Sequence, residues 1–161
     1  MKLSGKVAIV TGGGRDIGRA VCLKLAKEGA KVVINYFDSQ EHGAETLRQI
    51  EAEGGEAITV FADVTKQKDI DNLLQKTIAA YGQKIDILVN VAGGLFARKT
   101  IEEMDEAFFD LLLNVNFKSV FLVTKAVKPY MGQGGAIVNF ASQAARDGGG
   151  DPDANPRLRL A

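Results

Sequence analysis

The chain has 161 residues, of which 46% are hydrophobic, and its 20 lysines and arginines balance its 20 aspartates and glutamates. This length suits one domain with a buried core, and the zero net charge argues against a nucleic-acid or membrane partner. The single Cys22 and single histidine exclude an intramolecular disulfide and offer no cluster of metal ligands. We expect a soluble, cytoplasmic protein, because the N-terminal stretch is too interrupted for a signal peptide and no run of eighteen apolar residues occurs.

Five short apolar runs alternate with helical patterns along the chain. The expected strands are residues 6–11, 31–36, 56–62, 86–92 and 135–141. The expected helices are residues 17–29, 38–55, 65–82 and 100–131, and Thr100 and Glu103 have capping-box spacing at the start of the last one. This alternation predicts an α/β fold of the Rossmann type, in which a doubly wound parallel sheet of about five strands lies between two layers of helices.

The stretch TGGGRDIG, residues 11–18, follows the first strand and begins the first helix. Glycines at such a turn let the backbone approach a phosphate, and the start of the helix adds unbonded N–H groups and positive potential. A tight turn without a ligand is the alternative interpretation of the glycines alone. A Walker A phosphate loop is excluded, because no Gly-Lys-Ser/Thr follows.

Together with four later motifs, this turn resembles the signature of short-chain dehydrogenases/reductases. The later motifs are ADVT (62–65), NVAG (90–93), NVNFKSVF (114–121) and IVNFASQAA (137–145), and they occur in the family's order. The resemblance implies the strand order 3-2-1-4-5. It also implies an oxidoreductase that interconverts a ketone and a secondary alcohol with NAD(P), similar to 3-oxoacyl-acyl-carrier-protein reductases and to sugar or polyol dehydrogenases.

The resemblance also implies roles for individual residues. Asn116 and Ser142 match catalytic positions of the family. The positions that match its cofactor-binding residues are Gly12, Gly14, Arg15, Asp16, Ile17, Gly18, Tyr36, Asp63, Val64, Asn90, Ala92 and Gly93.

Asp16 stands where the family usually has its second glycine. Its carboxylate would either weaken binding of the pyrophosphate or cap the first helix, where an acid is favourable. We favour the cap, with part of the charge offset by Arg15.

The end of the second strand bears on the choice of dinucleotide. Tyr36 and Phe37 stand there in place of the acid that NAD users commonly carry, and Arg15 resembles a basic residue of NADP-using relatives. NADP(H) is therefore favoured over NAD(H). Asp38 is the counter-argument, although the neighbouring Ser39 could donate to a phosphate.

The family's proton donor has no counterpart in this sequence. The resemblance implies a tyrosine about twelve to fourteen residues beyond Ser142, with a lysine four residues later that lowers its pKa. All three tyrosines precede Ser142, and none has a lysine four residues later. We expect a chain truncated before this pair and therefore inactive, and a non-catalytic dinucleotide-binding module or assembly fragment is the alternative.

The last fifteen residues, DGGGDPDANPRLRLA, fit neither a strand nor a helix. We expect residues 1–146 to form the domain and residues 147–161 to be an irregular, disordered tail, from either a shifted reading frame or a natural short product. The family continues with further strands. The fifth strand is therefore expected to be an open sheet edge that promotes self-association into a homo-oligomer.

Overall fold

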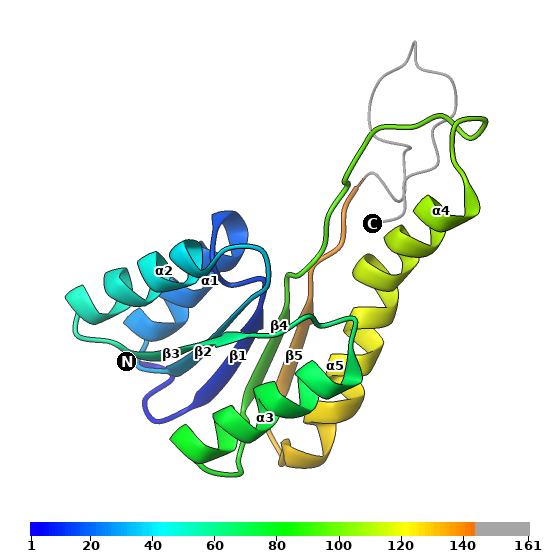
Figure 1. The fold of residues 1–161 in the computed structure, drawn as a ribbon. Coiled ribbons are helices and arrows are strands. Elements are labelled where there is room, and N and C mark those ends of the chain that lie inside the picture. Colours follow the sequence, from blue (N-terminus) through cyan, green and yellow to red (C-terminus); the bar gives the residue numbers. More distant parts are fainter. Residues whose placement is uncertain (144–161) are drawn as a thin grey trace.

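The computed structural model describes residues 1–143, and Figure 1 shows a sheet between two layers of helices. The strands are β1 (Val7–Thr11), β2 (Lys31–Tyr36), β3 (Glu56–Phe61), β4 (Ile87–Asn90) and β5 (Ala136–Asn139). They lie in the order β3-β2-β1-β4-β5 and all neighbours are parallel, which confirms the predicted fold class and strand order. The predicted tail, residues 147–161, lies outside the described residues.

The helices divide between the two faces of the sheet (Figure 1). Helices α1 (Asp16–Lys27) and α2 (Gln40–Ala52) cover one face, and α3 (Gln67–Tyr81) and α5 (Ser119–Val127) cover the other. Helix α4 (Glu106–Leu113) continues into α5 through a π-helical segment, Asn114–Lys118, and α5 ends in a 3-10 turn, Lys128–Tyr130. The first helix ends at Lys27 with Glu28 as its C-cap, and Gly29 follows as the predicted C′ glycine, with a φ of 93°.

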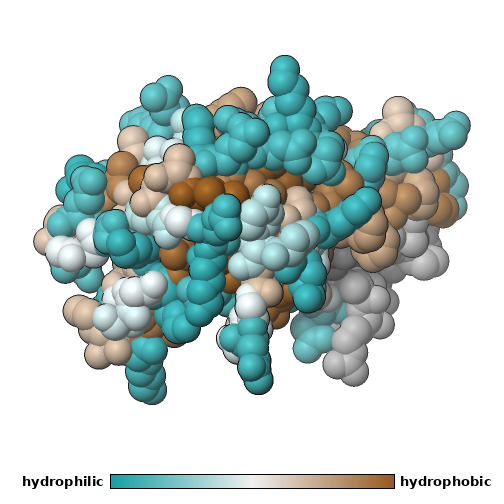
Figure 2. Space-filling model, turned by 90° about the horizontal axis from the view of Figure 1, so that it is seen from below, coloured by the Kyte–Doolittle hydropathy of each residue, from teal (hydrophilic) through white to brown (hydrophobic). Residues whose placement is uncertain are grey.

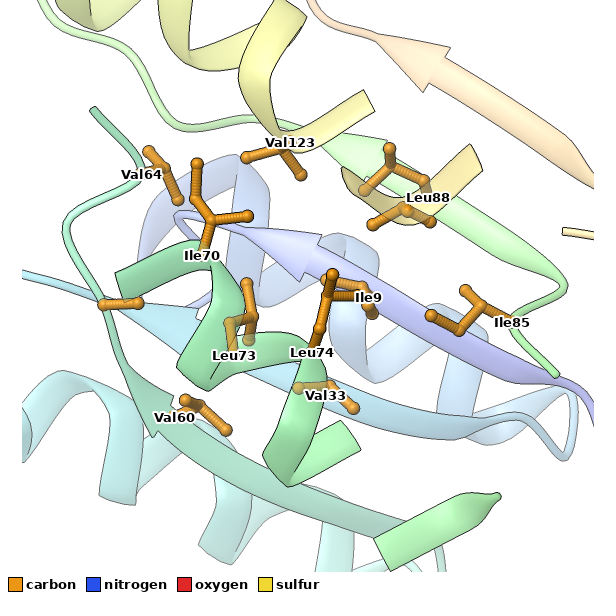
Figure 3. Close-up of a cluster of buried hydrophobic side chains, with 12 residues drawn as sticks. Ile9, Val33, Val60, Val64, Ile70, Leu73, Leu74, Ile85, Leu88 and Val123 are labelled. Carbon is orange, nitrogen blue, oxygen red and sulfur yellow. The ribbon is translucent and has the colours of Figure 1, made fainter. Parts of the chain in front are cut away.

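Two apolar clusters fill the space between the sheet and its helices. Ile9 and Val33 face α3 and α5, where they meet Val123 and neighbouring side chains (Figure 3). Val10, one residue further along β1, faces α1 and contacts the cluster around Cys22, because successive strand residues point to opposite faces. Burial raises the pKa of the Cys22 thiol to about 12, as expected for a core cysteine. On the face drawn in Figure 2, hydrophilic side chains surround a band of hydrophobic ones.

The fourth helix begins at Glu106, so the predicted start at Thr100 is wrong. Glu103 does accept the N–H of Thr100 at 2.9 Å, but this contact closes an isolated turn. The N-cap is Asp105, whose backbone is extended and whose carboxylate accepts the N–H of Phe108 at 2.7 Å. Aspartate ranks above threonine as an N-cap, which favours the later start.

One flank of the described molecule is apolar and exposed. The helical segment Glu106–Tyr130 is long and apolar enough, by length and composition, to cross a membrane, although a core helix can meet the same test. Its inner side carries Val123 and Val127 into the core, whereas Phe117 and Phe121 on it are 73% and 59% exposed. All four residues of β5 are exposed as well, unlike the buried residues of β1.

Asp86 joins the start of β1 to the start of β4. Its carboxylate accepts hydrogen bonds from Lys6 Nζ at 3.0 Å and from the N–H of Val7 at 3.1 Å, and Lys84 Nζ lies 3.2 Å away. Burial of this residue, which is 7% exposed, opposes ionisation, but these three partners outweigh the burial and hold the pKa of Asp86 below its ordinary value. The folded protein therefore binds the Asp86 proton more weakly than the unfolded chain does.

Replacing this carboxylate should change how stability depends on pH. The Asp86 contribution is present above the unfolded pKa of about 4 and is lost as the pH falls through the lower folded pKa. We expect Asp86→Asn to lower the free energy of unfolding at neutral pH by about 1 to 3 kcal/mol. We also expect it to flatten the decline between about pH 5 and pH 2. Urea unfolding at each pH measures both effects, with Asp71→Asn on the exposed side of α3 as the control. The same pH dependence in Asp86→Asn and wild type would contradict this assignment.

Candidate functional site

A cleft of about 830 Å³ lies at the carboxyl ends of β1, β2 and β4. The strand order reverses between β1 and β4, which is where open α/β sheets bind ligands. Eleven of the twelve predicted binding residues are among the described residues that line this cleft: Gly12, Gly14, Arg15, Asp16, Ile17, Gly18, Tyr36, Asp63, Val64, Ala92 and Gly93.

At Gly12 and Gly18, the turn after β1 and the start of α1 leave no room for a side chain. A Cβ on Gly18 would overlap the carbonyl oxygen of Gly12. A Cβ on Gly12, whose φ is 65°, would lie 3.0 Å from the Cα of Ala92. Helix α1 can therefore begin directly beside the end of β1, with the N–H groups of its first turn near the cleft. This bare backbone at a helix N-terminus fits a phosphate group.

Two buried polar side chains hold the loops around the cleft. Thr11 Oγ1 accepts the N–H groups of Val91 and Ala92 at 3.1 and 3.2 Å. Asn35 Oδ1 accepts the N–H of Gly12 at 3.2 Å, and its amide nitrogen donates to the carbonyl of the residue after β3 at 2.9 Å. The sequence analysis missed both residues. The available signal was a single polar residue near the carboxyl end of each otherwise apolar strand.

Asp16 does not cap α1, so this prediction is wrong. Arg15 occupies the N-cap position, and the described residues supply no side-chain cap there. Asp16 begins the helix with a φ of 47°, a left-handed conformation that glycine adopts freely and that costs other residues about 1 to 2 kcal/mol. Its side chain is 83% exposed, and Arg15 Nε lies 3.8 Å from the carboxylate, close enough to offset part of the charge.

An ion pair crosses the rim of the cleft near the end of β2. Arg15 Nη2 lies 3.2 Å from Asp38 Oδ2, and both side chains are 58% exposed. Ser39 is the N-cap of α2, and its hydroxyl accepts the N–H of His42 at 3.3 Å. The basic residue, the acid and the hydroxyl that the sequence analysis weighed therefore lie within one short stretch of the rim.

The segment after β3 borders the same end of the cleft. Asp63 Oδ1 accepts both the N–H and the hydroxyl of Thr65, at 2.9 and 2.7 Å, which closes a tight turn before α3. Val64 is buried and packs into the core below this turn. The carboxylate of Asp63 is thus held in place by its own turn.

Three predicted site residues are not among the described residues that line this cleft: the two matched catalytic positions and the cofactor-binding position Asn90. Asn116, in the π-helical segment, holds the loop after β4: its Oδ1 accepts the N–H of Gly94 at 2.9 Å, and its Nδ2 donates to the Gly94 carbonyl at 2.9 Å. Asn90 is not among the described lining residues; it is 3% exposed and donates to Asn139 Oδ1 at 2.8 Å. Ser142 is exposed, three residues after the end of β5.

Comparisons with known proteins agree with this architecture. A family model described as short chain dehydrogenase matches residues 6–151. An uncharacterized oxidoreductase of Thermotoga maritima is 43% identical over 146 residues, which cover 89% of this chain and 56% of that protein. The hydroxynaphthalene reductase-like protein Arp2 of Metarhizium robertsii is 36% identical over 147 residues, which cover 91% of this chain and 54% of that protein. The chain therefore spans about half the length of these relatives.

Solved structures give the same result. A short chain dehydrogenase from Burkholderia cenocepacia, in complex with NADP, superposes with a TM-score of 0.85 at 37% identity. The match covers 91% of this chain and 59% of the Burkholderia chain. A dehydrogenase/reductase from Sinorhizobium meliloti superposes with a TM-score of 0.86, also at 37% identity, and the match covers 89% of this chain and 56% of that one.

Substitutions at Asp16 separate its backbone conformation from its charge. Asp16→Gly and Asp16→Ala both remove the carboxylate, but only glycine adopts the left-handed conformation without strain. We expect Asp16→Gly to be more stable than Asp16→Ala by about 1 to 2 kcal/mol, measured by thermal and urea unfolding. Equal stabilities of the two variants would show that the left-handed conformation at this position carries no measurable cost.

Proposed function

Because the chain belongs to the short-chain dehydrogenase/reductase family, we propose that it binds a nicotinamide dinucleotide in the cleft at the carboxyl ends of β1, β2 and β4. The observation that carries this proposal is the glycine turn, where Gly12 and Gly18 leave the backbone open to a phosphate. The pyrophosphate would lie over the start of α1, beside Gly14 and Ile17. When bound, the nicotinamide would supply or accept a hydride.

The other lining residues would hold the two ends of the dinucleotide. Tyr36, Asp63 and Val64 border the end proposed for the adenosine, and Ala92 and Gly93 border the opposite end. Asn90 would act from below, by fixing the carboxyl end of β4 against β5.

The rim near β2 supports a preference for NADP(H) over NAD(H). Arg15 is half exposed there, and a 2′-phosphate would compete with Asp38 for its guanidinium. An exposed ion pair contributes only about 0 to 1 kcal/mol, whereas an arginine can bind a phosphate through two hydrogen bonds. The hydroxyl of Ser39 accepts a hydrogen bond from the backbone and retains its own proton to donate.

The acid and base groups of the chain support binding of the dinucleotide without turnover. Reduction of a ketone needs a proton at the developing alkoxide, and Asn116 and Ser142, the two matched catalytic positions, are an amide and an alcohol. None of the three tyrosines has a lysine four residues later. Burial, together with the charge of Glu56, raises the pKa of Tyr81 to about 12, which makes this phenol a weak acid. The chain would thus belong to an oxidoreductase family but would act as a module that binds the dinucleotide without transferring a hydride.

Titration with NADPH and NADH, followed by nucleotide fluorescence, tests both parts of the proposal. We expect NADPH to bind more tightly than NADH, and Asp38→Asn to widen this preference because it releases Arg15 from the ion pair. We also expect no NADPH oxidation above background with ketone substrates. Asp71→Asn, which removes an equal charge on α3, should leave both affinities unchanged. A clear preference for NADH would contradict the cofactor assignment, and turnover would contradict the assignment as a binding module.

We further propose that the exposed apolar flank binds a second copy of the chain. A groove of about 520 Å³ runs between β5 and the helical segment, and Phe117, Phe121 and Phe140 line it. Within residues 1–143, β5 is the last strand of the sheet, and its outer edge offers backbone groups for pairing beside this groove. Covering the flank in this way would be consistent with a soluble protein in the cytoplasm.

The charges along the helical segment favour a second copy as the occupant. The acidic residues Glu106 and Asp110 lie at its start, and the basic residues Lys118, Lys125 and Lys128 lie toward its end. In an antiparallel two-fold pair, the acidic start of one copy would lie beside the basic end of the other.

Sedimentation analysis over a range of concentrations tests this association. We expect the wild type to self-associate and the double variant Phe117→Ser/Phe121→Ser to sediment as a monomer, because the change removes the most exposed aromatic side chains of the flank. Ile101→Ser, which changes an exposed apolar residue in the loop before α4, should associate as the wild type does. A wild type that remains monomeric at all concentrations would contradict the proposal.

A further inference from the structure

A hydrogen-bond network behind the glycine turn joins this turn to α1 and α2. The carbonyl of Gly14 accepts hydrogen bonds from Arg19 Nη2 and from Thr46 Oγ1, both at 2.8 Å. Arg19 Nε also donates to Thr46 Oγ1 at 3.0 Å. The His42 carbonyl lies 3.0 Å from Thr46 Oγ1 and 3.4 Å from Arg19 Nη2, so the single hydroxyl proton of Thr46 is shared between two carbonyls.

This network fixes the direction of one peptide group in the turn. Two donors hold the Gly14 carbonyl toward α2. In a planar trans peptide the N–H points to the side opposite the carbonyl, so the N–H of Arg15 faces away from α2. Gly14 and Arg15 line the cleft, which is where this N–H would meet a phosphate.

The same network seats the first turn of α2. A Cβ on Gly14 would lie 3.3 Å from His42 Cβ, so the glycine turn and α2 are in close contact. A Cβ on Gly43 would lie 2.7 Å from the ring of Tyr36, so α2 also rests directly on the end of β2. Asp38 belongs to the short connection between Tyr36 and α2, and its position therefore follows from that of the helix.

We propose that Arg19 and Thr46 are positioning residues that set the discrimination between a 2′-phosphate and a 2′-hydroxyl on the adenosine ribose. This inference rests on the proposed dinucleotide site. Neither residue is among the described residues that line the cleft, so both act through Gly14 and α2. They hold the backbone of Arg15 on one side of the rim and the connection that carries Asp38 on the other, and the side chains of these two residues meet at 3.2 Å.

Substitutions at Thr46 test this role with little change of shape. Thr46→Val keeps the side-chain volume and removes the hydroxyl, whereas Thr46→Ser keeps the hydroxyl. We expect Thr46→Val to lower the ratio of NADPH to NADH affinity about tenfold, measured by titration calorimetry, and Thr46→Ser to retain the wild-type ratio. Arg19→Lys, which keeps the charge but loses the forked donor, should resemble Thr46→Val. The matched control is Arg48→Lys on the exposed side of α2, which should leave the ratio unchanged.

Amide hydrogen exchange at Gly43, whose N–H donates to the Ser39 carbonyl in the first turn of α2, gives a second readout when it is measured without nucleotide. We expect faster exchange in Thr46→Val and wild-type exchange in Thr46→Ser. An unchanged affinity ratio, or an equal loss for both dinucleotides, in variants that melt as the wild type does would overturn the positioning role, and so would unchanged exchange in Thr46→Val. A wild type that binds neither dinucleotide would overturn the proposed function itself, while the exchange rates still show whether the network seats the first turn of α2.

Discussion

The contact between Gly12 and Gly18 is the constraint on which the rest of the cleft depends. Because a Cβ on Gly18 would overlap the Gly12 carbonyl, α1 can start beside the end of β1 only if this position is glycine. Once α1 starts there, Arg19 lies one turn along it and reaches the Gly14 carbonyl, and Thr46 on α2 meets the same atom. A local steric rule in one turn thereby determines how the first two helices sit relative to each other.

The loops around the cleft are held from inside the sheet. Thr11 and Asn35 are buried, and leaving such groups unpaired would cost about 1 to 3 kcal/mol each. Both side chains form hydrogen bonds with backbone groups of neighbouring loops. Moving those loops would break these bonds and leave a buried polar group unpaired, so the two side chains restrain the loops. The shape of the cleft near β1 and β2 therefore depends on strand ends that are covered on both faces, and it does not depend on the exposed β5.

The sequence was sufficient to predict those parts of the structure that follow a repeating pattern or a known motif. Apolar runs between helices predicted five parallel strands, and the resemblance carried by the glycine turn and the later motifs led to eleven of the lining residues. The cap predicted at Asp16 is wrong because it depends on one backbone angle that residue type does not determine. The helix start predicted at Thr100 is wrong because Asp105, a stronger N-cap, follows it. The Arg15 and Asp38 pair is close only because the fold brings the two segments together. The burial of Asn90 away from the cleft was predictable in principle, because Asn90 shares a strand face with the core residue Leu88.

The π-helical segment explains how the loop after β4 is held although the flank beside it is open. A π-helical turn interrupts the regular pairing of each N–H with the carbonyl four residues before it, which lets the Leu112 carbonyl accept the side chain of Asn116 at 3.1 Å. That side chain also bonds both backbone groups of Gly94, so one amide ties a helix to a loop. Asn116 thus holds this loop from the helical side, while Thr11 holds the start of the loop from β1. A residue matched to the chemistry thereby positions the backbone beside Gly93, one of the residues proposed to bind the dinucleotide.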